Sequence, residues 1–272
     1  MSRSVLQKAV ALALVALLCL IVCCACAKSP SDNTDNLPEL VIGIDYYEPF
    51  SYKNDYGEFE GIDIDIATEV CKQIGYKPVF VPMVWSEKKS WLQDGRVDCI
   101  WCCFTMTGRE DDYAWSLPYM NSRQVVAVLE ESNIYTIADL TNKRVAVQST
   151  TKADDIFSGR AGKNVVIPQI KELNCFSTAS LMFAAIYEGY VDAIAGHEVV
   201  LRTHMKSSST QLRILDEPLL EVQLGIAFLK GSEQNVIQRI NDTLRLLASS
   251  GFMAELISDY GLDPEVYVVK YE

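Results

Sequence analysis

The stretch Gly95–Arg109, GRVDCIWCCFTMTGR, brings together residue types that suit the binding of a small anion. It begins with an apolar run, Val97–Phe104, whose length and composition predict a buried strand of a parallel sheet. The run ends in a hydroxyl-rich loop with one cation, Arg109. In open α/β sheets, ligands bind beyond the carboxyl ends of the strands, where such loops emerge. Because a guanidinium matches a carboxylate in a planar, bidentate fashion, we expect an anion-binding loop here. The alternative is that Arg109 and Glu110 are solvated charges at the start of a helix.

The segment Gly95–Ile100, GRVDCI, has an echo in Gly189–Ile194, GYVDAI. Each copy follows an amphipathic stretch and enters an apolar run, which predicts a helix, a glycine cap and then a strand. The copies start 94 residues apart (189 minus 95), a spacing of domain size. This repetition favours two similar α/β lobes with a cleft between them.

The elements that must position these loops follow from hydrophobic periodicity and turn residues. The first half of the chain predicts β-α-β-α-β order, typical of a parallel, doubly wound sheet. The expected strands are 40–44, 79–84, 97–104, 124–129, 143–148, 165–170 and 193–195, with a hairpin over 50–60 and an apolar return segment at 225–229. The first expected helix begins at Asp63 or Asp65 and ends at Gly75, and the second passes through Trp91 and Leu92. Further helices are expected over 137–140, after Lys152, and over 180–187, 235–248 and 252–260.

Residues 1–26 begin with positive charges and continue as an apolar run, a pattern that predicts a secretory signal peptide. Small residues before a cysteine at its end resemble a bacterial lipobox, so we expect acylation of Cys26, with Cys24 as the alternative and an ordinary secretion signal as a third reading. The polar segment that follows, up to residue 38, suits a flexible tether (27–38) between a membrane anchor and a folded body.

Composition limits the classes of function. The formal net charge is −12 and becomes −14 without the two cations of residues 1–26, so nucleic acid is not an expected partner. Five cysteines remain, an odd number that argues against a disulfide scaffold. Because the CxxC pair Cys99 and Cys102 falls along the expected strand 97–104, we predict no metal site and no cofactor.

Taken together, several segments resemble the extracellular solute-binding proteins of amino-acid ABC transporters, the family-3, periplasmic-binding-protein-like type II proteins. The segments that carry the resemblance are VIGIDYYEPFSY, GEFEGIDIDIATEVCKQIG, DGRVDCIWCCFTMTGRE, WSLPY, ADLTNKRVAVQ, EGYVDAIAGHE and LGIAFLKGS. The resemblance implies an α/β fold with two doubly wound lobes joined by a two-stranded hinge. Lobe 1 would hold 39–119 plus 228–272, lobe 2 would hold 124–220, and the hinge would lie near 120–123 and 221–227.

The resemblance also implies roles for individual residues. Tyr47 and Trp85 would pack on the ligand side chain, with Asp45 beside it. Cys103 and Thr105 would offer a carbonyl and a hydroxyl to an α-ammonium group. Arg109 would bind the α-carboxylate, joined from the second lobe by the loop at Thr151 and Lys152.

Two positions depart from the family pattern. Arg109 lies one residue closer to Thr107 than expected, with Glu110 in the usual place of the arginine. The acid that should pair with the ammonium falls at His197, with Glu198 as a neighbouring substitute. A neutral histidine could accept a hydrogen bond from ammonium, whereas a charged one would repel it. A histidine of the cleft wall or the core is the alternative for this position.

The expected function is a membrane-anchored, monomeric, extracytoplasmic binding protein. It would bind a small-molecule ligand, most simply an amino acid, and pass it to the permease of an ABC importer. The alternatives are a cyclohexadienyl-dehydratase-like enzyme on the same fold, which would need a general acid such as Glu198, and a sensory ligand-binding protein. The sequence contains no HExxH, GxSxG or phosphate-binding glycine loop, so we expect no enzyme.

Overall fold

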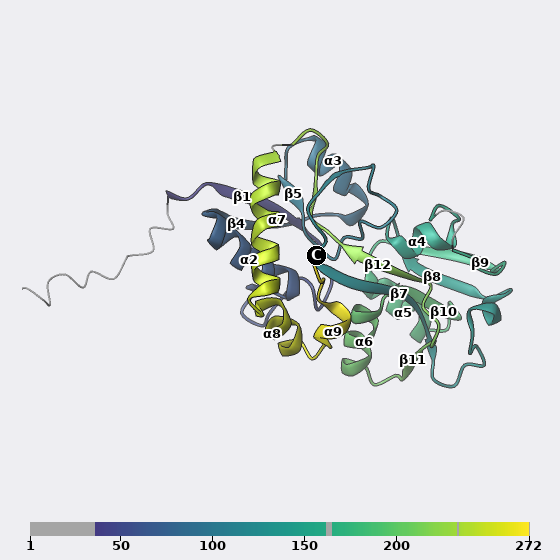
Figure 1. The fold of residues 1–272 in the computed structure, drawn as a ribbon. Helices are drawn as coiled ribbons and strands as arrows, with labels where there is room; N and C mark the ends of the chain where they lie inside the picture. The colour runs from purple at the N-terminus through teal and green to yellow at the C-terminus, as the bar shows by residue number, and fades with distance from the viewer. Residues whose placement is uncertain (1–35, 162–164, 233, 272) are drawn as a thin grey trace, which may run out of the picture. The chain divides into compact units, whose positions relative to one another are not determined.

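The computed structural model describes residues 36–161, 165–232 and 234–271. The predicted signal peptide at 1–26, with Cys24 and Cys26, lies outside the described residues, as does the tether up to residue 35. In the part from Pro38 onward, helices surround two mixed sheets (Figure 1). The expected α/β class is confirmed.

The five-stranded sheet has the order β4-β1-β5-β13-β6. Its first three strands are parallel, whereas β13 runs antiparallel to both β5 and β6. The strands are β1 (Glu39–Ile44), β4 (Lys77–Pro82), β5 (Cys99–Ile100), β6 (Ala114–Trp115) and β13 (Ala227–Phe228). A small hairpin of β2 (Tyr52–Lys53) and β3 (Phe59–Glu60) follows β1.

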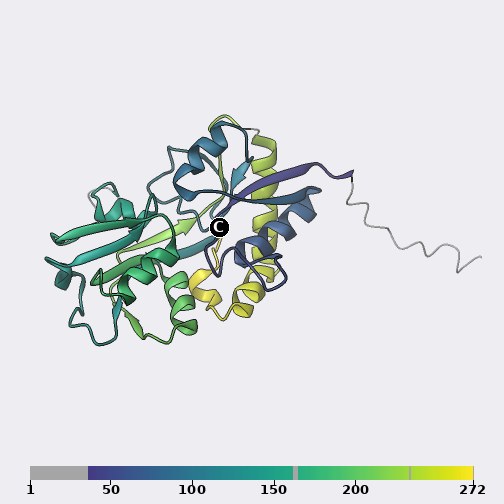
Figure 2. The ribbon, with the colours of Figure 1, turned by 180° about the vertical axis from the view of Figure 1, so that it is seen from behind.

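Helix α2 (Ile62–Ile74) shows why these segments fold as they do. Ile62, Ile66, Val70 and Ile74 recur every four residues and are buried, so one face of the helix packs on the core. The left-handed Gly75 ends it, as predicted. The other helices of this part are η2 (Trp85–Glu87), α3 (Lys88–Gln93), α7 (Gln234–Ser249), α8 (Phe252–Asp259) and α9 (Pro264–Tyr267). Figure 2 shows the same elements from behind.

The six-stranded sheet has the order β11-β7-β10-β8-β9, and β12 also pairs with β7. Strands β10, β8 and β9 are parallel, whereas β7 is antiparallel to β10, β11 and β12. The strands are β7 (Met120–Leu129), β8 (Arg144–Gln148), β9 (Glu172–Phe176), β10 (Ala193–His197), β11 (Leu212–Ile214) and β12 (Leu220–Leu224). The associated helices are η3 (Ile137–Leu140), α4 (Lys152–Phe157), α5 (Ala179–Tyr187) and α6 (Glu198–Ser207).

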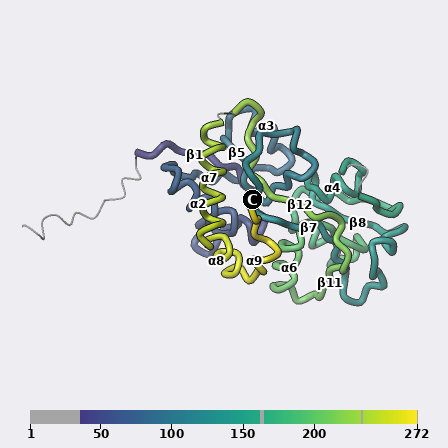
Figure 3. Tube along the Cα trace, viewed as in Figure 1, coloured from purple at the N-terminus to yellow at the C-terminus, as the bar shows by residue number. Residues whose placement is uncertain are grey.

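The chain passes between the two sheets along β7 and β12. These strands pair from Met120↔Leu224 to Gln124↔Leu220. Leu224 also bridges to Thr105, and Met120 bridges to Val268 near the C-terminal end. Figure 3 shows this end beside β7 and β12.

The two copies of the G-x-V-D sequence occupy matching places in the two sheets. Gly95 follows α3 and Gly189 follows α5, both with positive φ. Asp98 accepts the backbone N–H of Val41 in the neighbouring parallel strand, and Asp192 does the same for Arg144, each at 2.7 Å. The similar sequences therefore build the same strand-to-strand contact twice.

Several predicted boundaries were wrong. The strand expected at 97–104 is only Cys99–Ile100, because the chain turns before Cys103, which has a positive φ of 45°. The strand expected at 165–170 is absent there; Pro168 has no N–H to donate, and pairing with β8 begins at Glu172. Helix α2 is preceded by Gly61 as N-cap, not by Asp63 or Asp65. Helix α6 was not predicted.

Within the described ranges, no helix is both long and apolar enough to cross a membrane, and no cluster of three or more His, Cys, Asp or Glu side chains could hold a metal ion. The five cysteines of this part are all free: Cys71, Cys99, Cys102, Cys103 and Cys175.

We predict that Gly61→Ala strongly destabilises the fold. Gly61 has φ +131°, and an added Cβ would lie 2.3 Å from the carbonyl oxygen of Phe50. The combined strain and backbone clash should lower the free energy of unfolding by at least about 3 kcal/mol. Gly57→Ala is the control, because Gly57 has φ +81° but open space around the Cβ position, so only about 1 kcal/mol is expected. Equal losses in urea unfolding would contradict the close approach at Gly61.

Candidate functional site

A cavity of about 300 Å³, counting space open to solvent, lies between the loops of the two sheets. All of the predicted ligand-binding residues except Glu198 line it. The lining residues are Asp45, Tyr47, Trp85, Cys102, Cys103, Phe104, Thr105, Arg109, Gln148, Thr151, Lys152 and His197.

Each lining residue follows the carboxyl end of a strand or ends one. Asp45 and Tyr47 follow β1, and the cysteines and Thr105 follow β5. From the other sheet, Lys152 begins α4 just after β8, and His197 is the last residue of β10. The loops beyond both sheets therefore converge on one space, as expected for a ligand site in an open α/β sheet.

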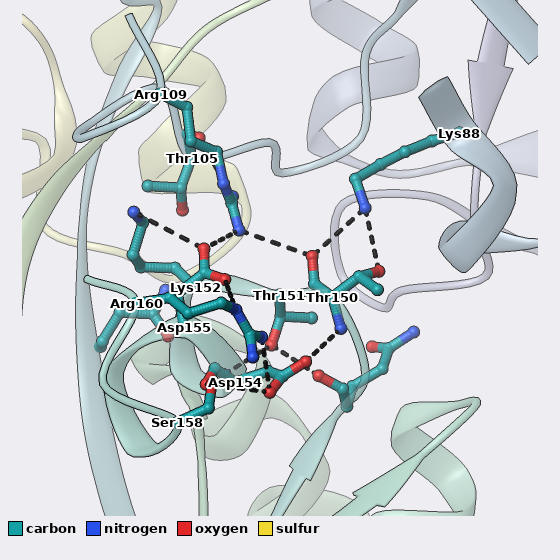
Figure 4. A network of polar contacts seen from close by, with 12 residues as sticks. Lys88, Thr105, Arg109, Thr150, Thr151, Lys152, Asp154, Asp155, Ser158 and Arg160 are labelled. Atoms are coloured by element: carbon teal, nitrogen blue, oxygen red, sulfur yellow. Dashed lines mark hydrogen bonds and ion pairs between the residues drawn. The ribbon is translucent and has the colours of Figure 1, made fainter. Parts of the chain in front are cut away.

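Arg109 reaches from the five-stranded side to the six-stranded side. Its Nη1 donates to the carbonyl oxygen of Thr105 at 3.3 Å, and its Nη2 lies 3.5 Å from the carbonyl oxygen of Thr150. Nη2 also forms an ion pair with Asp155 Oδ2 at 2.5 Å (Figure 4). The Arg109 side chain is only 10% exposed, so it is not a solvated surface charge.

Two lysines add positive charge on either side of Arg109. Lys152 Nζ lies 3.8 Å from Asp155 Oδ2, and its side chain is 2% exposed. Lys88 Nζ donates to the carbonyl oxygen and hydroxyl of Thr150, at 3.2 and 2.9 Å, and lies over the Trp85 ring. Burial and the nearby Arg109 lower the pKa of Lys88 to about 7 and lower that of Lys152. Because the positive charge of Arg109 contributes to both shifts, an anion bound at this end of the cavity would offset that repulsion.

Two residues with left-handed backbones flank the cavity, one from each side. Cys103 has φ 45°, and its N–H donates to Asp63 Oδ2 at 2.6 Å. Thr150 has φ 59°, and its N–H donates to Asp154 Oδ2 at 2.7 Å. Both aspartates lie in the first turn of a helix and are buried. Because such conformations are unfavourable for residues with a Cβ, these hydrogen bonds help to hold the loops in shape.

His197 is buried among uncharged groups. Its Nε2 lies 2.9 Å from Gln124 Nε2 and 3.2 Å from Thr105 Oγ1, and its Nδ1 lies 2.9 Å from Ser122 Oγ. Since the amide nitrogen can only donate, Nε2 accepts and Nδ1 carries the proton in this amide orientation. Burial, with a smaller effect of Arg109, lowers the pKa of His197 to about 3. The ring is therefore neutral at physiological pH.

The remaining wall combines an acid with aromatic rings. Asp45 Oδ2 accepts from Gln148 Nε2 at 2.9 Å, a contact between the two sides of the cavity. Burial raises the pKa of Asp45, and the hydrogen bond from Gln148 opposes that rise. The Tyr47 ring meets His197 edge-on at 6.3 Å between centroids, and Trp85 meets Phe104 in the same way at 5.1 Å.

Glu198 does not line the cavity. Its Oε2 pairs with Arg123 at 2.6 Å, and its Oε1 pairs with Arg202 at 2.8 Å. Tyr267 also lies 3.4 Å from Oε2. His197 and Glu198 are consecutive, and their side chains meet different surroundings.

Sequence reasoning missed several residues of the site. Gln148 could have been found, because it ends the predicted strand just before the hydroxyl-rich loop. Lys88 offered no signal, since a lysine pair on a short helix normally marks a solvated face. Asp155 was equally hidden among the polar residues of α4, although it contacts Arg109. The structure also places Cys102 and Phe104 in the cavity wall.

Residues 40–263 match the family model of the bacterial extracellular solute-binding proteins, family 3. The chain belongs to this family. The expectation drawn from the motifs is confirmed, and with it an extracellular or periplasmic class of binding protein.

Several named proteins match this chain over most of their length, which supports the family assignment. The chain is 25% identical over 260 residues to the Probable amino-acid-binding protein YxeM of Bacillus subtilis, covering 94% of this chain and 95% of that protein. It is 26% identical to the L-cystine-binding protein TcyA of the same organism, covering 77% and 76%. The solved structure of Tv2483 bound to L-arginine has a TM-score of 0.76 and 25% identity, covering 86% of this chain and 95% of that one.

The relatives are named as binding proteins, which supports the expectation that this protein is not an enzyme. One similar structure is the ancestral amino acid-binding protein AncCDT-1, a precursor of cyclohexadienyl dehydratase, with a TM-score of 0.73 and 26% identity over 82% of this chain and 95% of that one. The geometry argues against the dehydratase alternative in this chain, because the acid proposed for it, Glu198, is held by two arginines outside the cavity.

We predict that His197 makes folding less favourable in acid. Its folded-state pKa of about 3 lies below the ordinary 6.5, so between these values the unfolded chain binds a proton that the folded chain does not. The contribution of the neutral ring to the free energy of unfolding is complete above pH 6.5. As the pH falls below this value, that contribution is lost by up to about 1.4 kcal/mol per pH unit. Between pH 7 and 4.5, wild type should lose roughly 2 to 3 kcal/mol more than His197→Gln in denaturant unfolding. A difference between the two proteins that does not change with pH would contradict the neutral, buried ring.

Proposed function

We propose that this protein binds a free amino acid in the cavity between the two sheets and delivers it to the permease of an ABC importer. The observation that carries the proposal is the convergence of Arg109 and Lys152, from opposite sides, on one buried cavity. A cation pair of this kind suits a carboxylate. Closure of the cavity around the bound carboxylate excludes water and so strengthens its electrostatic attraction to the two cations. Relatives named for amino acids, including the ABC transporter glutamine-binding protein GlnH of Bacillus subtilis, support the same reading.

We infer that the binding cycle opens and closes the cavity at β7 and β12. In this proposal lobe 1 comprises 39–119 and 228–272, lobe 2 comprises 124–220, and residues 120–123 and 221–227 form the hinge. The paired backbone from Met120 to Gln124 supports this division, because it carries the chain between the two sheets. The contacts of Arg109 with Asp155, Lys88 with Thr150 and Asp45 with Gln148 would hold the closed state.

The test of ligand class is a thermal-shift panel of the L-amino acids, with dicarboxylates and polyamines as controls. A compound present at about 100 times its Kd should add about 2.7 kcal/mol of stability, which corresponds to roughly 5 to 10 °C in Tm for a domain of this size. Arg109→Ala should abolish the shift, because it removes the buried cation that pairs with the ligand carboxylate.

Arg245→Ala is the matched control, since Arg245 is exposed and pairs only with Asp242 on the surface of α7. It should bind as wild type does. Circular dichroism would establish that Arg109→Ala is folded. A folded Arg109→Ala that keeps the full shift would exclude this arginine as the carboxylate-binding group.

We also propose that the mature protein is held on the extracytoplasmic face of the membrane by a lipid on Cys26, or alternatively on Cys24. The support is sequence alone: an apolar segment ending in Ala25 and Cys26 before a polar stretch. Cys26→Ser should release the protein from the membrane fraction or stop its processing, whereas Cys24→Ser should leave it attached. Detergent phase partitioning of cells expressing each variant distinguishes the two cysteines, and membrane attachment of both variants would exclude either one as the sole anchor.

A further inference from the structure

One wall of the cavity next to Arg109, formed by Thr105 and His197, is uncharged. Arg109 Nη1 donates to the carbonyl oxygen of Thr105, and the hydroxyl of Thr105 lies 3.2 Å from His197 Nε2. A ligand carboxylate bound at Arg109 can therefore direct the substituent of its neighbouring carbon toward Thr105 and His197. These two side chains present a hydroxyl and an imidazole ring, and neither carries a charge at neutral pH.

The surroundings of His197 keep it neutral. Its hydrogen-bond partners are Ser122, Gln124 and Thr105, all uncharged, and the side chain is 4% exposed. Either orientation of the Gln124 amide leaves the ring between neutral groups. The low pKa of His197, caused first by burial and then by Arg109, agrees with this geometry.

The carboxylates close to this wall are engaged elsewhere. Glu198 is held by Arg123 and Arg202 outside the cavity. Asp63 is 1% exposed and accepts the N–H of Cys103, and it does not line the cavity.

On the far side of Arg109, Asp155 pairs with Arg109 and lies near Lys152 and Arg160. Asp45 does line the cavity, but its two oxygens accept hydrogen bonds from Gln148 and from the N–H of Tyr46. These two donors are neutral and leave the charge of an ionised Asp45 in place, but among the described residues no carboxylate hydrogen-bonds to Thr105 or His197. An ammonium group placed beside Thr105 would thus contact neutral acceptors.

We propose that the site selects its ligand by the carboxylate and holds the α-substituent through neutral hydrogen bonds only, so that L-2-hydroxy acids bind as well as the corresponding L-amino acids. The proposal rests on the carboxylate site proposed above and narrows its chemistry. A hydroxyl group can exchange hydrogen bonds with the Thr105 hydroxyl without burying a charge. An ammonium group makes similar hydrogen bonds but loses its hydration with no opposite charge in contact, so the ammonium form gains no affinity over the hydroxyl form.

The test compares matched pairs that differ only at the α-position: L-arginine with L-2-hydroxy-5-guanidinopentanoate, L-phenylalanine with L-phenyllactate, and L-leucine with L-2-hydroxyisocaproate. Isothermal titration of the wild-type protein gives the ratio of the two Kd values in each pair. We expect a ratio within about tenfold of one, because neutral contacts discriminate weakly between a hydroxyl and an ammonium group. In a site that pairs the ammonium group with a carboxylate, removal of the ammonium group lowers the affinity far more. A preference for the amino acid of more than about tenfold in these pairs would overturn the proposal.

His197→Asp supplies the missing carboxylate and should raise the preference for the amino acid at least about tenfold, by pairing with the ammonium. His197→Asn is the matched neutral control, and its ratio should stay near that of wild type. If His197→Asp does not fold, the wild-type ratio alone decides. If it folds and the ratio does not change, the placement of the α-substituent beside residue 197 is wrong.

The outcomes also separate this inference from the proposed function. Binding that requires Arg109 but strongly favours the ammonium form would retain the carboxylate site and reject the neutral wall. Asp45→Asn would then show whether Asp45 is the missing counter-charge. Absence of any shift across the full L-amino-acid panel, together with absence of binding by both members of every pair, would reject the carboxylate site itself, and with it this inference.

Discussion

The buried guanidinium of Arg109 is the constraint on which the cavity depends. A buried cation is unfavourable unless its donors are satisfied and an opposite charge is near. Here the partners come from both sides: the carbonyl oxygen of Thr105 from one, and the carbonyl oxygen of Thr150 and the carboxylate of Asp155 from the other. The same interactions that satisfy the charge therefore bring the two sheets together, and an incoming carboxylate must join or replace Asp155 at this arginine.

The loops around Arg109 are shaped by a device that occurs on each side of the cavity. A residue with a left-handed backbone, Cys103 or Thr150, has its N–H fixed by a buried aspartate from the first turn of a helix. Burial raises the pKa of Asp63 to about 7, so the hydrogen bond at Cys103 is made by a group close to its titration point near neutral pH. At Thr150 the result is a carbonyl oxygen that lies within reach of Lys88 and Arg109.

Several features of the fold and of the cavity could be predicted because they depend on residue patterns within single segments of the sequence. The echo of G-x-V-D identified equivalent strands in both sheets, and the hydroxyl-rich loop after the strand identified Arg109. The antiparallel direction of β7 in the six-stranded sheet and of β13 in the five-stranded sheet could not be predicted in the same way, because periodicity reports burial and not strand direction. Lys88 and Asp155 were missed because they contact the site through partners 62 and 46 residues away in sequence. His197 was recognised as a departure, but its neutrality follows from Ser122 and Gln124, which only the fold brings next to it.

The C-terminal segment touches both sides of the passage between the sheets. Val268 bridges to Met120 and accepts from Asn121 Nδ2 at 3.3 Å, while Tyr271 Oη donates to the carbonyl oxygen of Pro118 at 2.6 Å. Tyr267, just before them, reaches Glu198 at the start of α6. With the hinge proposed above, a fluorescent reporter fused to this end would lie beside the rotation axis, where closure of the cavity displaces it little. A sensor that relies on distance therefore needs its label on a segment that does not pack against β7 or β12.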